Sequence, residues 1–245
     1  MMDKRETEVH VLELSRPLLH KIYGGYSIDK SQIDRPDAAI YVKKPHRAFC
    51  KSRVPFRVGI EITTCDKCGD LGYLKDDKFG KDKVDNQIND FIHGIDSKTP
   101  NKKVDVKIPV DYIYEGVVRK NSKFNDYVCA GVFKEVVLIC FSEVIGTDNV
   151  IFKNGLRQWS EYLISKSNSM FDKVIFVDLL GGRPVCIYDK QNPHLIQPLP
   201  YAYENSSITV MQSPMLRFEQ QNNLNEIYAN EPLIAKRIAK PRSKK

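Results

Sequence analysis

The segment Phe56–Thr63 carries an apolar side chain at every second position, which is the period of a strand with one buried face. Glu61 and Thr63 share the opposite face of that strand. Because an unpaired charge is costly to bury, Glu61 on so apolar a strand needs a cationic partner or a metal. Asp37 precedes a second apolar strand, 38–43. If the strands 38–43 and 55–63 pair as a hairpin, Asp37 and Glu61 can converge on one divalent cation.

The periodicity of the remaining chain predicts an α/β fold, in which helices flank a mixed sheet. After a helix over 3–24 and the hairpin, we expect a helix over 112–128, a buried strand over 132–141 and a helix around 156–163. A second hairpin follows, from strands 173–180 and 185–188. Within the first helix, Pro17 should kink or split the helix, and Gly24-Gly25 should end it.

Three regions outside these elements are expected to be irregular. Residues 66–107 form an insertion, either a lid or a decorative loop, with a short helix over 84–95. Residues 191–234 are predicted to wrap the main domain, which spans residues 1–190. The segment 235–245 is expected to be a basic, flexible tail.

The net charge of +7 is unevenly distributed along the chain. The tail supplies six of these charges, from Lys236, Arg237, Lys240, Arg242, Lys244 and Lys245. The rest of the chain therefore carries about +1. The tail is either an arm that touches phosphates or an ordinary solvated terminus.

Two short motifs, Arg35-Pro36-Asp37 and Gly59-Ile60-Glu61-Ile62-Thr63, resemble those of the PD-(D/E)XK nuclease superfamily. The chain is similar to a branch in which another residue, here Thr63, occupies the lysine position. The resemblance covers roughly residues 6–190. It implies a restriction-endonuclease-like fold and a deoxyribonuclease that hydrolyses DNA phosphodiester bonds with Mg²⁺ or Mn²⁺.

Lys120 is a candidate for the missing lysine. Successive helix residues rotate by about 100°, which places Lys120 in the apolar stripe of the helix 112–128, where its ammonium would face the sheet. Lys123 lies at the edge of that stripe. Alternatively, Lys120 buries only its stem and extends its ammonium into solvent.

The resemblance also implies a role for each candidate residue. Asp37, Glu61 and the backbone carbonyl of Ile62 would hold the cation, and Lys120 or Lys123 would orient the attacking water or stabilise the transition state.

Thr63 could hydrogen-bond the water, and Glu6 on the first helix could complete the site, with Glu13 in reserve. The alternatives are ordinary ones: a turn at Pro36-Asp37, a solvated glutamate on an edge strand, and exposed helix carboxylates.

Zinc is a competing idea, from His46, Cys50, Cys65 and Cys68. Cys50 precedes the strand 55–63 and Cys65 follows it, so about 27 Å of strand would separate the two pairs. The remaining cysteines lie in apolar runs and are expected in the core: Cys129, Cys140 and Cys186. Six scattered cysteines favour a reducing, cytoplasmic setting.

Three classes of function therefore remain open. The first is the metal-dependent nuclease, with DNA as its partner. The second is a catalytically inactive protein of the same fold that binds nucleic acid or a protein. The third is a structural protein of a phage or mobile element. No membrane partner is expected, because no stretch approaches about 20 apolar residues, and a homodimer is compatible with each class.

Overall fold

The computed structural model describes residues 4–32, 35–45, 54–67, 69, 92–94 and 102–212. The chain divides into two units, one comprising Met1–Lys67 with Lys107–Ile208, the other Cys68–Val106 with Thr209–Lys245. Strands β4 (Lys102–Lys107) and β8 (Ser207–Gln212) carry most of the described residues of the second unit and pair as a two-stranded sheet.

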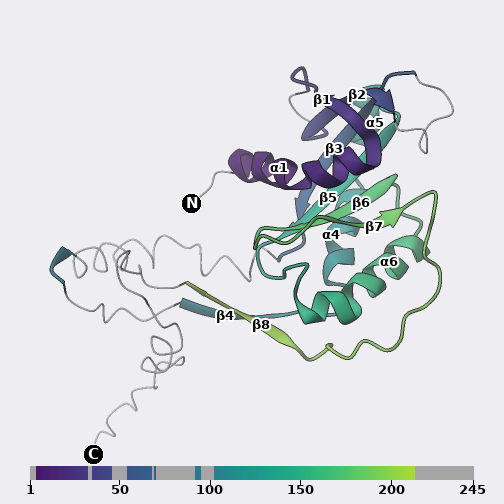
Figure 1. Cartoon of the computed structure of the whole chain (residues 1–245). Coiled ribbons are helices and arrows are strands. Elements are labelled where there is room, and N and C mark those ends of the chain that lie inside the picture. The colour runs from purple at the N-terminus through teal and green to yellow at the C-terminus, as the bar shows by residue number, and fades with distance from the viewer. Residues whose placement is uncertain are drawn as a thin grey trace, which may run out of the picture. The chain divides into compact units, whose positions relative to one another are not determined.

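A six-stranded mixed sheet forms the centre of the first unit (Figure 1). Its strands, in spatial order, are β1 (Gly24–Ile28), β2 (Ala38–Pro45), β3 (Phe56–Thr64), β5 (Glu135–Ser142), β6 (Lys173–Asp178) and β7 (Val185–Asp189). The first three are antiparallel, β3, β5 and β6 are parallel, and β7 is antiparallel to β6. The predicted α/β class, a mixed sheet flanked by helices, is confirmed.

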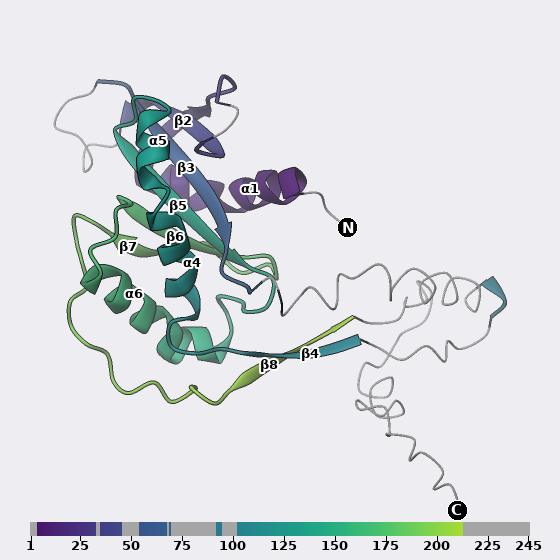
Figure 2. The ribbon, with the colours of Figure 1, turned by 180° about the vertical axis from the view of Figure 1, so that it is seen from behind.

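Helices cover both faces of this sheet, as Figures 1 and 2 show from opposite sides. One face is covered by α1 (Lys4–Tyr23). The other is covered by α4 (Tyr112–Asn121), α5 (Phe124–Cys129) and α6 (Arg157–Lys166), which follows the π-helical turn η1 (Phe152–Leu156). The alternation along β3 decides which side chains meet which helices. Val58, Ile60 and Ile62 join the core under α1, and Glu61 points toward α4 and α5.

The helix predicted over 112–128 is two helices, which a short turn after Asn121 separates. Asn and Ser side chains compete for backbone hydrogen bonds, so Asn121-Ser122 is a weak place in a helix. Val128, predicted to lie in the apolar stripe, is 48% exposed, whereas Tyr127 is 3% exposed.

Other elements differ from expectation in smaller ways. Helix α1 continues through Pro17, so the predicted split does not occur, and it ends at Tyr23, directly before Gly24-Gly25. Strands β1, β4 and β8 were not predicted, because they are short and lie beside glycines or within polar segments. The helix predicted over 84–95 and the tail lie outside the described residues, apart from residues 92–94.

Among the described residues, no helix combines the length and apolar character that crossing a bilayer requires.

Candidate metal and catalytic site

The pairing of β2 with β3 sets Asp37 opposite Glu61. Ala38 is the register partner of Ile60, so the residues on either side of that pair, Asp37 and Glu61, face each other. Residues directly opposite in an antiparallel pair project to the same face, with Cβ atoms about 4.5–5.5 Å apart. The backbone N–H of Ile62 donates to Asp37 Oδ2 at 2.8 Å, which ties the aspartate to the strand that carries Glu61.

Tight packing before β2 brings Asp37 to this place. Pro36 is buried, and its carbonyl oxygen accepts a hydrogen bond from Gln32 Nε2 at 3.0 Å. A Cβ atom at Gly59 would lie 2.9 Å from Pro36 Cγ and 3.3 Å from the Phe133 ring, closer than the roughly 3.5–4.0 Å of a favourable carbon contact. The absence of a side chain at Gly59 therefore lets the Pro36-Asp37 segment lie against β3.

Glu61 is a buried carboxylate with two donors on one oxygen. Only 3% of the residue is exposed. Its Oε1 accepts hydrogen bonds from Lys120 Nζ at 2.5 Å and from Tyr127 OH at 2.9 Å. Burial raises the pKa of Glu61, the hydrogen bond from Lys120 opposes that rise, and the charge of Asp37 adds to it. A lysine and a tyrosine thus supply the partners that this carboxylate needs in the interior.

Lys120 lies near the end of α4 and Tyr127 lies in α5, seven residues later. The place of Lys120 in the apolar stripe predicts that it faces the sheet, and the structure sets its ammonium on Glu61. Sequence reasoning missed Tyr127, although seven residues are almost two helical turns and would place it near the face of Lys120. Burial and its bond to Glu61 raise the pKa of Tyr127, so its hydroxyl is protonated and donates.

The oxygen atoms left at this place fit a hard divalent cation. Within the described residues, Asp37 Oδ1 and Glu61 Oε2 accept no hydrogen bond. The N–H and C=O of one strand residue point to the same side, so the carbonyl of Ile62 is directed toward Asp37. Carboxylate and carbonyl oxygens are the ligands that Mg²⁺ and Mn²⁺ prefer. The described part of the chain holds no group of three His, Cys, Asp or Glu suited to a metal, so a cation here would depend on two carboxylates and the backbone.

Among the described residues, three of the predicted site residues form no hydrogen bond or ion pair with Asp37 or Glu61. Thr63 is half-buried on the same face of β3 as Glu61, and Lys123 is exposed in the turn between α4 and α5. Glu13 forms a surface ion pair with Arg16 at 2.8 Å. In the described part of the chain, none of the three is bonded to Glu61.

The start of α1 lies within electrostatic range of the pair. Glu8 is the main cause of the raised pKa of Lys4, and the charges of Asp37 and Glu61 contribute to it. Glu6, in the same first turn, is exposed. Two carboxylates that share a cation need no bond to each other, so the role of Glu6 stays a prediction.

Glu135 has partners of the same kinds on the opposite face of the sheet. Its Oε2 accepts hydrogen bonds from Tyr23 OH at 2.6 Å and Lys173 Nζ at 3.3 Å. The next backbone N–H, that of Val136, donates to Asp172 Oδ2 at 2.8 Å. Lys173 is only 1% exposed, so its ammonium is closed to a substrate, and the cluster offers a comparison for Glu61.

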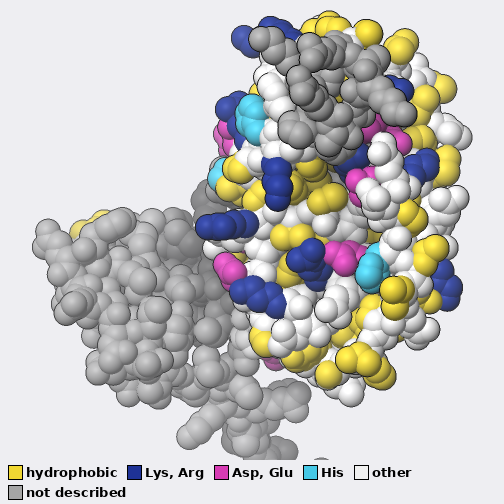
Figure 3. All heavy atoms as spheres, turned by 45° about the vertical axis from the view of Figure 1, so that its right-hand side comes forward, with side chains coloured by type: hydrophobic (Ala, Val, Ile, Leu, Met, Phe, Trp, Pro, Cys, Tyr) yellow, Lys and Arg dark blue, Asp and Glu magenta, His cyan; other side chains and the backbone are white. Residues whose placement is uncertain are grey.

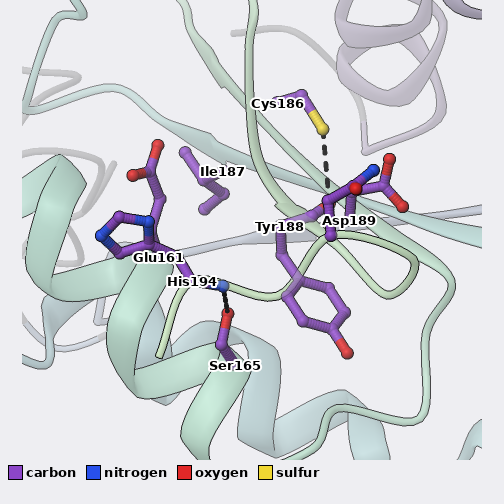
Figure 4. A pocket seen from close by; sticks show the side chains of 8 residues that line it. Glu161, Ser165, Cys186, Ile187, Tyr188, Asp189 and His194 are labelled. Atoms are coloured by element: carbon purple, nitrogen blue, oxygen red, sulfur yellow. Dashed lines mark hydrogen bonds between the residues drawn. The ribbon is translucent and has the colours of Figure 1, made fainter. Parts of the chain in front are cut away.

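A hollow of about 210 Å³ lies between α6 and β7, and no residue of the candidate site lines it (Figure 4). Its lining residues are Glu161, Ser165, Cys186, Ile187, Tyr188, Asp189, Asn192 and His194. Glu161 is bonded to Arg157 at 2.9 Å, and Ser165 Oγ accepts from the backbone N–H of His194 at 2.9 Å. Burial raises the pKa of the Cys186 thiol, which makes it a poor nucleophile. The hollow is also smaller than the roughly 300–1,000 Å³ of typical ligand pockets.

Three of the residues weighed as zinc ligands, His46, Cys50 and Cys68, lie outside the described residues. The fourth, Cys65, is a buried free thiol. Burial, together with a contact to Cys140, raises its pKa well above the ordinary value. Since zinc binds the thiolate, this environment disfavours Cys65 as a ligand.

The surface that Figure 3 shows carries lysine and arginine side chains as separate groups among apolar and acidic ones. That distribution agrees with the near balance of charge outside the last ten residues. The described residues on this face therefore do not form a continuous basic surface.

Comparisons with protein-family models, with curated proteins and with solved structures find no match to this chain.

Proposed function

We propose that this chain is a metal-dependent nuclease that hydrolyses DNA phosphodiester bonds. The observation that carries the proposal is the register of β2 and β3, which sets Asp37 opposite Glu61. The ammonium of Lys120 is hydrogen-bonded to the same glutamate. A restriction-endonuclease-like fold is supported by α4 and β5, since a helix with spaced lysines and then an apolar strand follows Glu-x-Thr in the PD-(D/E)XK proteins that the motifs resemble.

In this proposal Asp37, Glu61 and the carbonyl of Ile62 hold Mg²⁺ or Mn²⁺. The cation would lower the pKa of a bound water and balance the charge that builds on the phosphate. Lys120 takes the place of the family's lysine, and its ammonium orients the water or stabilises the transition state. The hydroxyl of Thr63 can hydrogen-bond the water but supplies no charge.

Cationic side chains near the pair support a polyanionic substrate. The side chain of Lys4 is 87% exposed and lies within electrostatic range of both carboxylates. Arg119 donates to the backbone carbonyl of Thr64 at 2.8 Å, at the end of β3. Contacts from such cationic side chains to DNA phosphates would contribute affinity without reading the base sequence. The described cysteines are free thiols, which suits a reducing, cytoplasmic setting for the enzyme.

The test compares the wild-type chain with Glu61→Gln on supercoiled plasmid and on single-stranded DNA. Each substrate is incubated with Mg²⁺, with Mn²⁺ and with chelator. We expect nicking that needs the cation and that falls by at least about 100-fold in Glu61→Gln, because a direct ligand should matter at least as much as residues around it. Glu135→Gln is the matched control, since Glu135 also accepts hydrogen bonds from a tyrosine and a lysine. This variant should retain activity.

A second candidate, a protein of this fold that binds DNA without cutting it, is favoured by the close Lys120–Glu61 ion pair. That pair already balances the buried charge without a cation, and Thr63 stands where the family carries lysine. A binder would retain its affinity in chelator and after Glu61→Gln. Retained binding with no nicking in any cation would replace the first proposal with this one.

A further inference from the structure

The hydroxyl of Tyr127 is the second donor to Glu61, and the family motifs assign it no role. Both Tyr127 and Lys120 reach the same atom, Oε1. Within the described residues this leaves Oε2 without a hydrogen bond, on a carboxylate that faces Asp37.

The two donors differ in how firmly they are held. The side chain of Lys120 is 22% exposed and ends a long, flexible stem. Tyr127 is 3% exposed, and its ring lies beside Phe171 with centroids 6.3 Å apart. Phe171 in turn packs edge-on against Phe124, at 5.2 Å between centroids. A rigid ring in a packed aromatic cluster holds its hydroxyl at one place, whereas an ammonium on a partly exposed stem can move.

We infer that Tyr127 is a positioning residue of the proposed cation site, which orients Glu61 by holding Oε1 and leaving Oε2 for the metal. The inference rests on the proposed function, in which Glu61 is a ligand and Lys120 acts on water or phosphate. If Lys120 leaves Oε1 to act there, only Tyr127 continues to hold the carboxylate. Partners that orient a ligand in this way commonly change metal affinity by about 10–100-fold when removed.

The experiment measures binding of Mn²⁺ alone to the full chain, by paramagnetic resonance of the free ion. Tyr127→Phe keeps the ring and removes only the donor, and we expect its Mn²⁺ dissociation constant to rise by about 10-fold or more. Tyr23→Phe is the matched control, because it removes a tyrosine donor from Glu135, and its Mn²⁺ affinity should equal that of the wild type. Urea unfolding of both variants without metal shows that each is folded.

A rescue variant places p-aminophenylalanine at position 127, which restores an N–H donor on the same ring. Its Mn²⁺ affinity should return toward the wild-type value, and it replaces Tyr127→Phe as the decisive variant if the latter does not fold. The positioning role is overturned if Tyr127→Phe leaves the Mn²⁺ affinity unchanged. It is also overturned if the rescue variant binds Mn²⁺ as weakly as Glu61→Gln does. In both cases the proposed nuclease stands. Wild-type Mn²⁺ binding that Glu61→Gln leaves unaltered overturns both.

Discussion

Replacing Lys120 by methionine removes the charge that balances Glu61 and keeps most of the apolar stem. Removing one partner of a buried ion pair costs about 3–5 kcal/mol of unfolding free energy, because it leaves the other charge uncompensated. The side chain of Glu61 is 4% exposed and that of Lys120 is 22% exposed, and Tyr127 continues to donate to Oε1. We therefore expect a loss below or at the low end of that range, about 2–3 kcal/mol at pH 7.

The size of this loss should depend on pH with a defined sign. Burial already raises the folded-state pKa of Glu61 above an ordinary value of about 4.3, and without Lys120 it rises further. A carboxyl whose folded-state pKa is raised weakens the fold as the pH rises toward that pKa. The effect vanishes below the unfolded-state pKa, where both states bind the proton. The deficit of Lys120→Met should therefore be largest at neutral pH and shrink as the pH falls toward about 4.3.

The assay is urea unfolding of wild type and variant at pH 7 and pH 5, with free energies from linear extrapolation. Lys123→Met is the control, because Lys123 is exposed in the turn after α4; it should change stability by less than about 0.5 kcal/mol. The reasoning is refuted if Lys120→Met costs no more than Lys123→Met at pH 7, or if its deficit is the same at both pH values.

Two further substitutions test the packing against Asp37 and the hydrogen bonds of a buried carboxylate at the end of β6. Gly59→Ala should cost about 1–3 kcal/mol in urea unfolding and weaken Mn²⁺ binding, since the new Cβ would displace Pro36 and with it Asp37; unchanged Mn²⁺ affinity would contradict this. For Asp178, burial alone would raise the pKa, but hydrogen bonds from the Thr147 backbone and other donors outweigh it and lower the pKa. The contribution of ionised Asp178 to stability is therefore present at neutral pH and lost in acid. Asp178→Asn should lower the unfolding free energy by about 1–3 kcal/mol at pH 7 and by less at pH 3. An equal loss at both pH values would contradict this expectation.

The strands of the candidate site were predictable because their signal is local. Alternation over Phe56–Thr63 identifies the strand and the face of Glu61, and the apolar run after Asp37 identifies its neighbour. A short connection makes antiparallel pairing the natural arrangement of two such strands. Strand β1 was not predictable in this way, because Gly24-Gly25 reads as a helix end and only three residues of the strand remain after it.

The partners of Glu61 were predictable only in part, because helix geometry gives the direction of a side chain but not the atom that it bonds. Lys120 lies before the turn that follows Asn121, so counting at 100° per residue gives its direction correctly. Tyr127 lies seven residues later, within about 20° of Lys120 by the same count. An aromatic side chain on that face is also typical of a packed core, so the count gives the direction of Tyr127 but not its bond to Glu61.

Glu61 and Glu135 show that a set of partners does not by itself identify a catalytic residue. Each glutamate accepts from one tyrosine and one lysine on a single oxygen. The difference lies in the access of the lysine, because the side chain of Lys173 is 2% exposed and that of Lys120 is 22% exposed; the glutamates run the other way, at 11% for Glu135 and 4% for Glu61. An ammonium that already has one side in solvent is within reach of a phosphate, whereas a fully buried ammonium is not. Lys120 is therefore the one of these two lysines that a substrate could reach, and the paired Gln substitutions at Glu61 and Glu135 compare the two clusters directly.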